Sequence, residues 1–262
     1  MRTNLEPPTA LFLFAHQDDE FGVFHQIEHE RRAGRRVHCI YATDGSATAL
    51  PDRRNAESTD VLKKLGVAVE NIYFAGQELG IKDGFLHADI ELLDKWLDSF
   101  LDHHSFIDRC FIPAWEGGHP DHDLLHAITV SNLNSRNRLE IARQYPLYNG
   151  KGCRGPFFKA LSPISENGPI EKKKFGWNDR LRYISLCLAY PSQWKSWIGL
   201  FPFVSFRILF GGTQMLQRVS TDRLAKPPHS GPLYYERRAF LDWTALRSAL
   251  DRLEIIYQKK TS

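Results

Sequence analysis

Cysteine clusters, long apolar runs and an excess of one charge are all missing from this chain of 262 residues. The four cysteines show no C-x-x-C spacing, which argues against a disulfide framework and favours buried, reduced thiols. The formal charge of +3 is too small to indicate nucleic-acid binding. The apolar run near the N-terminus is too short for a secretion signal or a membrane span, so we expect a cytoplasmic protein without a transmembrane segment.

Internal repeats and low-complexity linkers are also missing, so we do not expect a second independent domain. The residues present alternate between two patterns. Short apolar runs at 11–14, 37–41, 72–75 and 109–113 predict strands, and the segments 51–65, 88–101 and the one that begins at Pro120 predict helices. This alternation predicts an α/β fold with a Rossmann-like, doubly wound and mostly parallel sheet between helices.

Beyond residue 140 the pattern loosens. Segments 141–148 and 157–161 are candidate strands, and 176–190 and 241–253 are candidate helices. With 42% hydrophobic residues, we expect one domain over 1–262, with a core at 1–140 and a C-terminal elaboration at 141–262 over the active-site edge. The basic cluster Lys172-Lys173-Lys174 predicts a solvated loop rather than a nucleic-acid tail.

The apolar run at 11–14 is followed within two residues by a histidine and then by acidic residues. A run of this kind before a helical pattern predicts a buried parallel strand, and ligands bind at the carboxyl ends of such strands. His16 and Asp19 are three residues apart and can point at one spot, which offers nitrogen and oxygen ligands to a metal such as zinc. Asp18 lies free beside them. The alternative interpretation is an acid-capped helix N-terminus.

A second predicted strand end supplies the same residue types. The run at 109–113 leads into Gly117-Gly118-His119-Pro120-Asp121-His122, where Pro120 suits the first turn of a helix. Two strand ends of one sheet would bring these side chains to the same edge. They would form an open three-ligand metal site with spare acid and base groups, which is typical of hydrolytic zinc centres.

Spacing does not choose among the possible ligands. His16, Asp19, His119, His122 and His126 are more than a three-ligand site can use. The last three histidines are three and four residues apart, so each neighbouring pair would share a helix face.

These motifs resemble the PIG-L (LmbE-like) family of zinc-dependent N-acetylglucosaminyl deacetylases. Gln17 departs from the family, which most often has proline there, but it affects the rigidity of a turn and not a ligand. The resemblance covers most of the first two thirds of the chain and rests on Ala15-His16-Gln17-Asp18-Asp19-Glu20, Thr43-Asp44-Gly45, Arg54-x-x-Glu57 before Leu65-Gly66-Val67, Asp83-Gly84, Gly118-His119-Pro120-Asp121-His122 and Tyr190-Pro191-Ser192-Gln193.

The resemblance implies a metal set and a proton base. His16, Asp19 and His122 would bind Zn²⁺ or a similar divalent ion, and His126 would be a packed or supporting histidine. Asp18 would take the proton of the attacking water.

The resemblance also implies residues around the substrate. His119, kept off the metal, would if protonated stabilise the oxyanion and then protonate the amine, with Asp121 as its orienting carboxylate. Arg54 and Asp83 would reach sugar hydroxyls. The alternatives are an ion pair between Arg54 and Glu57 on one helix face and a plain turn at Asp83.

Together these features predict a zinc-dependent hydrolase that removes the acetyl group from a free or conjugated N-acetylated amino sugar and leaves an amine and acetate. Its partner would be a small-molecule or glycoconjugate acetamido sugar. The alternatives are a metal-dependent hydrolase of phosphoesters or non-sugar amides, and a sugar-binding protein without turnover. The sequence does not name the group to which the sugar is attached, the oligomeric state or the metal used in the cell.

One apolar stretch, residues 194–210, is not explained by this chemistry. Pro202 interrupts it, Arg207 adds a charge, and its apolar core is too short to span a bilayer. It predicts either core packing or a subunit interface, or an interfacial wall beside the crevice that admits a lipid-linked sugar. If the stretch is an interfacial wall, replacing Trp197 and Phe201 should leave the thermal stability nearly unchanged.

Overall fold

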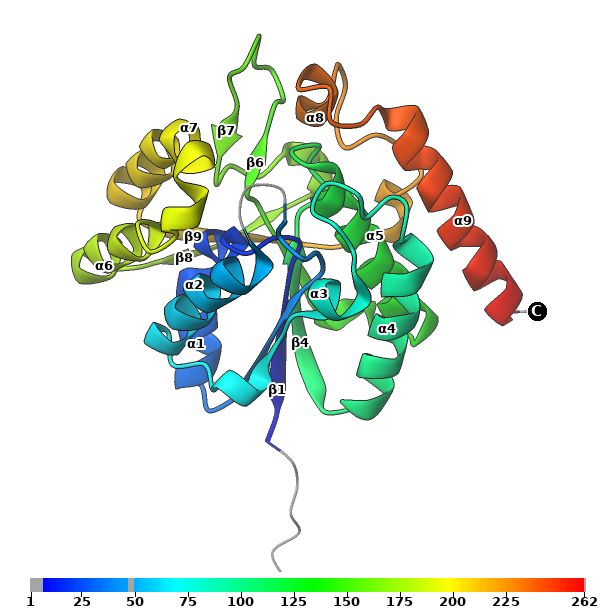
Figure 1. Cartoon of the computed structure of the whole chain (residues 1–262), viewed down its shortest axis with the longest axis horizontal. Coiled ribbons are helices and arrows are strands. Elements are labelled where there is room, and N and C mark those ends of the chain that lie inside the picture. Colours follow the sequence, from blue (N-terminus) through cyan, green and yellow to red (C-terminus); the bar gives the residue numbers. More distant parts are fainter. Residues whose placement is uncertain (1–6, 47–49, 262) are drawn as a thin grey trace, which may run out of the picture.

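The computed structural model describes residues 7–46 and 50–261, which build a seven-stranded sheet between layers of helices (Figure 1). The strand order is β3-β2-β1-β4-β5-β9-β8. The first five strands of this order are parallel, whereas β9 and β8 are antiparallel to their neighbours. The strands are β1 (Thr9–Phe14), β2 (Arg36–Tyr41), β3 (Ile72–Tyr73), β4 (Ile107–Pro113), β5 (Ala142–Tyr145), β8 (Ile170–Lys174) and β9 (Thr213–Arg218).

Helices cover both faces of the sheet and divide the core into two clusters. One face packs against α1 (Phe24–Arg32), α2 (Pro51–Lys64), α6 (Trp177–Cys187) and α7 (Trp194–Phe206). The other packs against α4 (Ile90–His103), α5 (Pro120–Ser135) and α9 (Trp243–Thr261), and the shorter α3 (Ala75–Leu79) and α8 (Tyr234–Arg237) complete the set. Every residue of β1 is buried, because helices cover both of its faces. The mostly parallel, doubly wound architecture is thus confirmed.

The strand predictions differ from the structure mainly where a predicted strand is shorter or is divided in two. The third strand ends at Tyr73, since Ala75 already begins α3. The predicted strand at 141–148 is two strands: β5 in the main sheet and β6 (Tyr148–Asn149), which pairs with β7 (Lys159–Ala160) in a separate hairpin. Pro146 lies between them and has no N–H to continue the ladder.

The C-terminal part extends the first sheet, which the sequence patterns did not predict. Strand β9 pairs with β5, and β8 pairs with β9 as the edge strand. Lys172-Lys173-Lys174 lie in β8, so the prediction of a loop there is wrong. Charged side chains on an edge strand discourage further pairing, which accounts for lysines in this position.

The stretch 194–210 forms α7 and the wide helical turn η6 (Arg207–Gly211). Trp197 and Val204 are buried in the core, so the core interpretation is confirmed for this side of the helix. Phe201 is partly buried against the same cluster. The prediction that Trp197 and Phe201 could be replaced without loss of stability is therefore inconsistent with their burial. The opposite side of α7 is exposed.

The strand order places a crevice at the carboxyl end of β1. From β1 the chain moves to β2 and β3 on one side, and later returns to β4 and β5 on the other. Ligands bind at such reversals because neighbouring loops diverge there. The loops after β1 and β4 carry the two predicted motifs, so the topology brings these motifs together.

Candidate metal centre and active site

Three side chains from the two motifs converge at the reversal of strand order. His16 Nδ1 lies 3.2 Å from His122 Nε2, and His122 Nε2 lies 3.1 Å from Asp19 Oδ1. His16 Nδ1 lies 3.6 Å from Asp19 Oδ2. Donor atoms bound at about 2.0–2.1 Å to a tetrahedral metal stand about 3.3 Å apart. All three residues are buried, and their geometry fits a metal ion.

Asp121 determines which nitrogen of His16 faces this site. Its Oδ2 lies 3.1 Å from His16 Nε2, and its carboxylate also accepts the backbone N–H groups of Gly84 and Leu86. A carboxylate acceptor keeps the imidazole proton on Nε2, so Nδ1 presents a lone pair toward His122 and Asp19. We expected the Asp121 carboxylate to orient His119. That prediction is wrong, because the carboxylate contacts His16 instead.

The site attracts positive charge. Burial alone lowers the pKa of His16, but Asp83, Asp121 and Asp19 outweigh it and raise this pKa well above its usual value. Burial alone raises the pKa of Asp19, but His122 and His16 bring it far below its usual range. A cluster of buried carboxylates around two imidazoles is therefore stabilised by a cation, which is what a metal ion supplies.

His119 lies beside the metal set. Its ring is 4.5 Å from that of His16 between centroids, and its Nδ1 accepts the backbone N–H of Asp121. This hydrogen bond leaves the proton on Nε2, so His119 is a neutral donor, and burial lowers its pKa to about 3. The neutral form differs from the protonated imidazole that the sequence suggested. His16, His119 and Asp121 form a second possible metal group, but the carboxylate of Asp121 already accepts three N–H groups.

Asp18 adopts a strained backbone conformation, with φ 117°. Glu20 helps to hold it, because its carboxylate accepts the Asp18 backbone N–H at 2.9 Å. Residues in sparsely populated conformations persist where the surrounding structure imposes them, often at functional sites. Burial raises the pKa of Asp18 to about 8, although the nearby Arg54 opposes the shift. The side chain lines the crevice beside Asp19.

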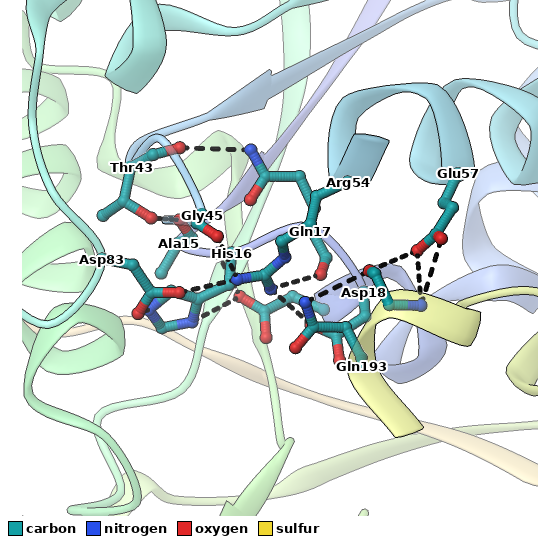
Figure 2. Close-up of polar contacts among 12 residues, drawn as sticks. Ala15, His16, Gln17, Asp18, Thr43, Gly45, Arg54, Glu57, Asp83 and Gln193 are labelled. Atoms are coloured by element: carbon teal, nitrogen blue, oxygen red, sulfur yellow. Dashed lines mark hydrogen bonds and ion pairs between the residues drawn. The ribbon is translucent and has the colours of Figure 1, made fainter. Parts of the chain in front are cut away.

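Arg54 links the loops around Asp18, as Figure 2 shows. Its Nη1 donates to Asp83 Oδ2 at 2.7 Å and to the Gly45 carbonyl at 2.9 Å. Its Nη2 donates to the Gln17 carbonyl at 2.8 Å and lies 3.5 Å from Asp18 Oδ1. Both terminal nitrogens thus bind groups of the protein itself. The alternative ion pair with Glu57 is not formed.

Glu57 instead joins α2 to the start of α7. Its carboxylate accepts the backbone N–H and the hydroxyl of Ser192. Figure 2 shows Glu57 on the same side of the site as Asp18 and Gln193. The segment after Ser192 lines one side of the crevice with Gln193, Ser196 and Leu200. The crevice has a volume of about 560 Å³, which suits a small ligand.

The sequence patterns missed Tyr148, which follows β5 at the same sheet edge. Its ring lies 5.6 Å from that of His122 and lines the crevice. Glu116 holds it there, because its Oε1 accepts the backbone N–H groups of Leu147 and Tyr148. A Cβ on Gly118 would lie 1.9 Å from the Tyr148 carbonyl oxygen, so this approach requires glycine. Applying the strand-end rule to β5 would have identified Tyr148.

His126 is a packed residue, as expected. Its Nδ1 lies 2.8 Å from the Pro113 carbonyl oxygen, and its ring lies 5.9 Å from that of Trp115. It does not belong to either possible metal group within the described residues.

Comparisons with known proteins agree with this arrangement. A family model, PIG-L, described as GlcNAc-PI de-N-acetylase, matches residues 11–133. A probable N-acetylglucosaminyl-phosphatidylinositol de-N-acetylase of Dictyostelium discoideum is 30% identical over 130 residues, which are 47% of this chain and 46% of that protein. The match thus spans about half the length of that relative.

Solved structures share the fold at low identity. A conserved protein of Thermus thermophilus has a TM-score of 0.58 and 19% identity, with 86% of this chain and 98% of that chain covered. The N,N'-diacetylchitobiose deacetylase of Pyrococcus horikoshii has a TM-score of 0.58 and 16% identity, with 86% and 88% covered. At these identities the likeness concerns the fold alone.

Proposed function

We propose that this chain, whose residues 11–133 match the PIG-L family model, is a metal-dependent N-deacetylase of an acetamido sugar. Water would cleave the amide bond and leave a free amine and acetate. The observation that carries the proposal is the convergence of His16 Nδ1, His122 Nε2 and an Asp19 oxygen in one buried site. Asp18 and His119 lie free of that set and beside it, as a hydrolytic centre requires.

His16, Asp19 and His122 would hold zinc, since two imidazoles and one carboxylate are a common open zinc set. When bound, the metal would polarise the amide carbonyl and lower the pKa of a water molecule. The protein itself holds the three ligand atoms in place. Asp121 retains the Nε2 proton of His16, and the Asp19 carboxylate also accepts the His16 backbone N–H at 2.8 Å.

Asp18 is the proposed general base. It adjoins a ligand, lines the crevice and is positioned by Arg54 and by its constrained backbone. Its raised pKa means that it must first ionise, which a cation held by the neighbouring Asp19 would favour. The ionised carboxylate can then take the proton of the attacking water.

His119 is the proposed donor to the substrate. Its Nε2 proton can stabilise the oxyanion of the tetrahedral intermediate and then pass to the departing nitrogen. Its Nδ1 is occupied by the Asp121 backbone N–H, which holds the ring orientation. The neutral imidazole can donate the hydrogen bond to the oxyanion. Proton transfer to the departing nitrogen requires the protonated ring, since transfer from the neutral ring would leave an imidazolate, and the proton that Asp18 takes from the water can supply it.

Asp83 is the proposed contact to a sugar hydroxyl. Its Oδ1 lies 3.3 Å from His16 Nε2 and its Oδ2 accepts from Arg54, so it faces both the metal set and the crevice. Since the terminal nitrogens of Arg54 bind the protein, we assign Arg54 to positioning Asp83 and Asp18.

We also place the protein in a reducing compartment, because its four cysteines are free and three are buried.

An acetate-release screen of the zinc-loaded protein tests the function. The substrates are free N-acetylglucosamine and its nucleotide, thiol and lipid conjugates. Acetate release with the wild type, and release about 10²–10⁴-fold slower with Asp18→Asn, supports the proposal. Phosphate release from a phosphoester panel, or sugar binding without turnover by any substrate, would instead favour the two alternative functions.

A further inference from the structure

Helix α7 lies at the margin of the molecule beside the β6–β7 hairpin (Figure 1). The outer side of α7 and η6 forms an exposed apolar surface. Ile198 is 66% exposed, Phe206 is 61% exposed and Phe210 is 68% exposed. At 100° per residue Phe206 falls on the side of α7 opposite Trp197 and Val204, which are buried, and Ile198 lies on the flank, about 100° from Trp197. Phe210 follows in η6, where its ring lies 4.9 Å from that of Phe206. Exposed apolar side chains that cluster in this way usually mark an interaction site.

A groove continues this surface onto the hairpin. Pro202, Phe203 and Phe206 line one side, and Phe158 and Lys159 line the other. The groove has a volume of about 480 Å³. The same helix also faces the active-site crevice through Ser196 and Leu200, so the apolar surface and the crevice share one wall.

The charged residues of this region are all positive. No Asp or Glu occurs between Asp179 and Asp222, although the whole chain contains 31 acidic residues. Cations do occur there, including Lys195, whose ammonium lies 5.8 Å from the Trp194 ring centre. Within the described residues, neither Lys195 nor Lys159 forms an ion pair with a carboxylate.

We propose that the outer face of α7 and η6, with the groove against β7, docks on the surface of an anionic lipid bilayer. Aromatic and aliphatic side chains would enter the headgroup boundary while Lys195 and Lys159 meet lipid phosphates. The helix would lie in the interface plane. No helix among residues 7–46 and 50–261 is long and apolar enough to cross a membrane, and α7 itself has 13 residues.

Charge favours a bilayer over a second copy of this chain. A two-fold symmetric dimer brings the same patch of each subunit together, so Lys195 would face cations of the other copy with no carboxylate in the segment to offset them. An anionic lipid surface offers the complementary charge. This inference is independent of the proposed deacetylation.

Co-sedimentation of the full chain with vesicles tests the inference. We expect binding to phosphatidylcholine vesicles that contain phosphatidylserine, and weaker binding to phosphatidylcholine alone or at high salt. The double variant Ile198→Ser, Phe206→Ser should bind on the order of tenfold more weakly. A matched control, Leu92→Ser, Ile255→Ser, replaces exposed residues of α4 and α9 and should bind as the wild type does.

Equal binding by the two double variants, or no vesicle binding by the wild type at low salt, would overturn the proposal. Concentration-dependent dimers that disappear in the Ile198, Phe206 variant, without vesicle binding, would also overturn it and assign the face to a second copy. A readout that does not depend on those variants is quenching of tryptophan fluorescence by brominated lipid. Quenching should occur in the wild type and fall in Trp194→Phe, whereas unchanged quenching would contradict insertion at α7.

Discussion

The contact between Asp121 and His16 yields the sharpest prediction, because the sequence and the structure assign Asp121 different partners. The carboxylate accepts three N–H groups, from His16 at 3.1 Å, Gly84 at 2.7 Å and Leu86 at 3.2 Å. In Asp121→Asn, one acceptor oxygen becomes an N–H₂ donor. Whichever way the amide points, one or more of these three groups loses its acceptor.

The free-energy cost of Asp121→Asn can be estimated for both orientations of the new amide group. If the amide nitrogen faces Leu86, a buried backbone N–H is left unpaired, which costs about 1–3 kcal/mol of folding free energy. If it faces His16, the imidazole must accept at Nε2 and carry its proton on Nδ1, which opposes metal binding. Loss of such a supporting carboxylate typically lowers metal affinity by about 10–100-fold, or about 1.4–2.7 kcal/mol.

The assay titrates the metal-free protein with zinc against a chromophoric chelator and measures acetate release at each free zinc concentration. We expect a zinc Kd raised by about 10–100-fold, with kcat close to that of the wild type once zinc is saturating. Asp123→Asn is the control. Asp123 is equally buried, but it accepts from Glu116 and Gly117, so its loss should lower stability and leave the zinc Kd nearly unchanged.

An unchanged zinc Kd together with a reduced kcat for Asp121→Asn would refute this reasoning. That result would mean that Asp121 acts through His119, as the motif alone suggested.

Three other predictions concern single side chains. His122→Ala should lose most bound zinc whereas His119→Ala should keep it, because only His122 contributes to the three-ligand set; full zinc occupancy in His122→Ala by elemental analysis would contradict the assignment. Asp18→Asn should keep zinc and thermal stability but lose about 10²–10⁴-fold in turnover, and near-normal turnover would place the base elsewhere. Burial lowers the pKa of His38 to about 4, so the unfolded chain binds its proton first and stability should fall as the pH drops from about 6.5 toward 4. Urea unfolding measures the free energy of unfolding at pH 7 and at pH 5. Between these pH values His38→Phe should lose about 1–2 kcal/mol less of it than the wild type, a figure that allows for solvent near the ring, and equal losses would exclude His38 as a cause.

The sequence by itself determined the central sheet and the edge at which chemistry occurs. Apolar runs such as 11–14 are buried on both faces, so their composition alone indicates parallel strands. The polar residues after those runs must then meet at the carboxyl edge, because parallel strands end there together. This reasoning brought the two motifs to one edge, and the family resemblance then selected His16, Asp19 and His122 as ligands; the structure places their donor atoms within 4.8 Å of one another.

Only the tertiary structure decided which atoms pair within that site. His119, His122 and His126 have similar spacing, yet their rings meet different neighbours: the Asp121 backbone N–H, Asp19 and the Pro113 carbonyl. Asp121 contacts a histidine 105 positions away, which no local pattern can indicate.

The C-terminal elements show the same limit. Strand β8 reads as a run of charges and is a strand because β9 offers it a hydrogen-bonding edge. The apolar stretch of α7 has two different faces, one in the core and one exposed, because the neighbouring elements cover only one side of the helix. Composition records how apolar a segment is, whereas partners distant in sequence determine which of its side chains are buried.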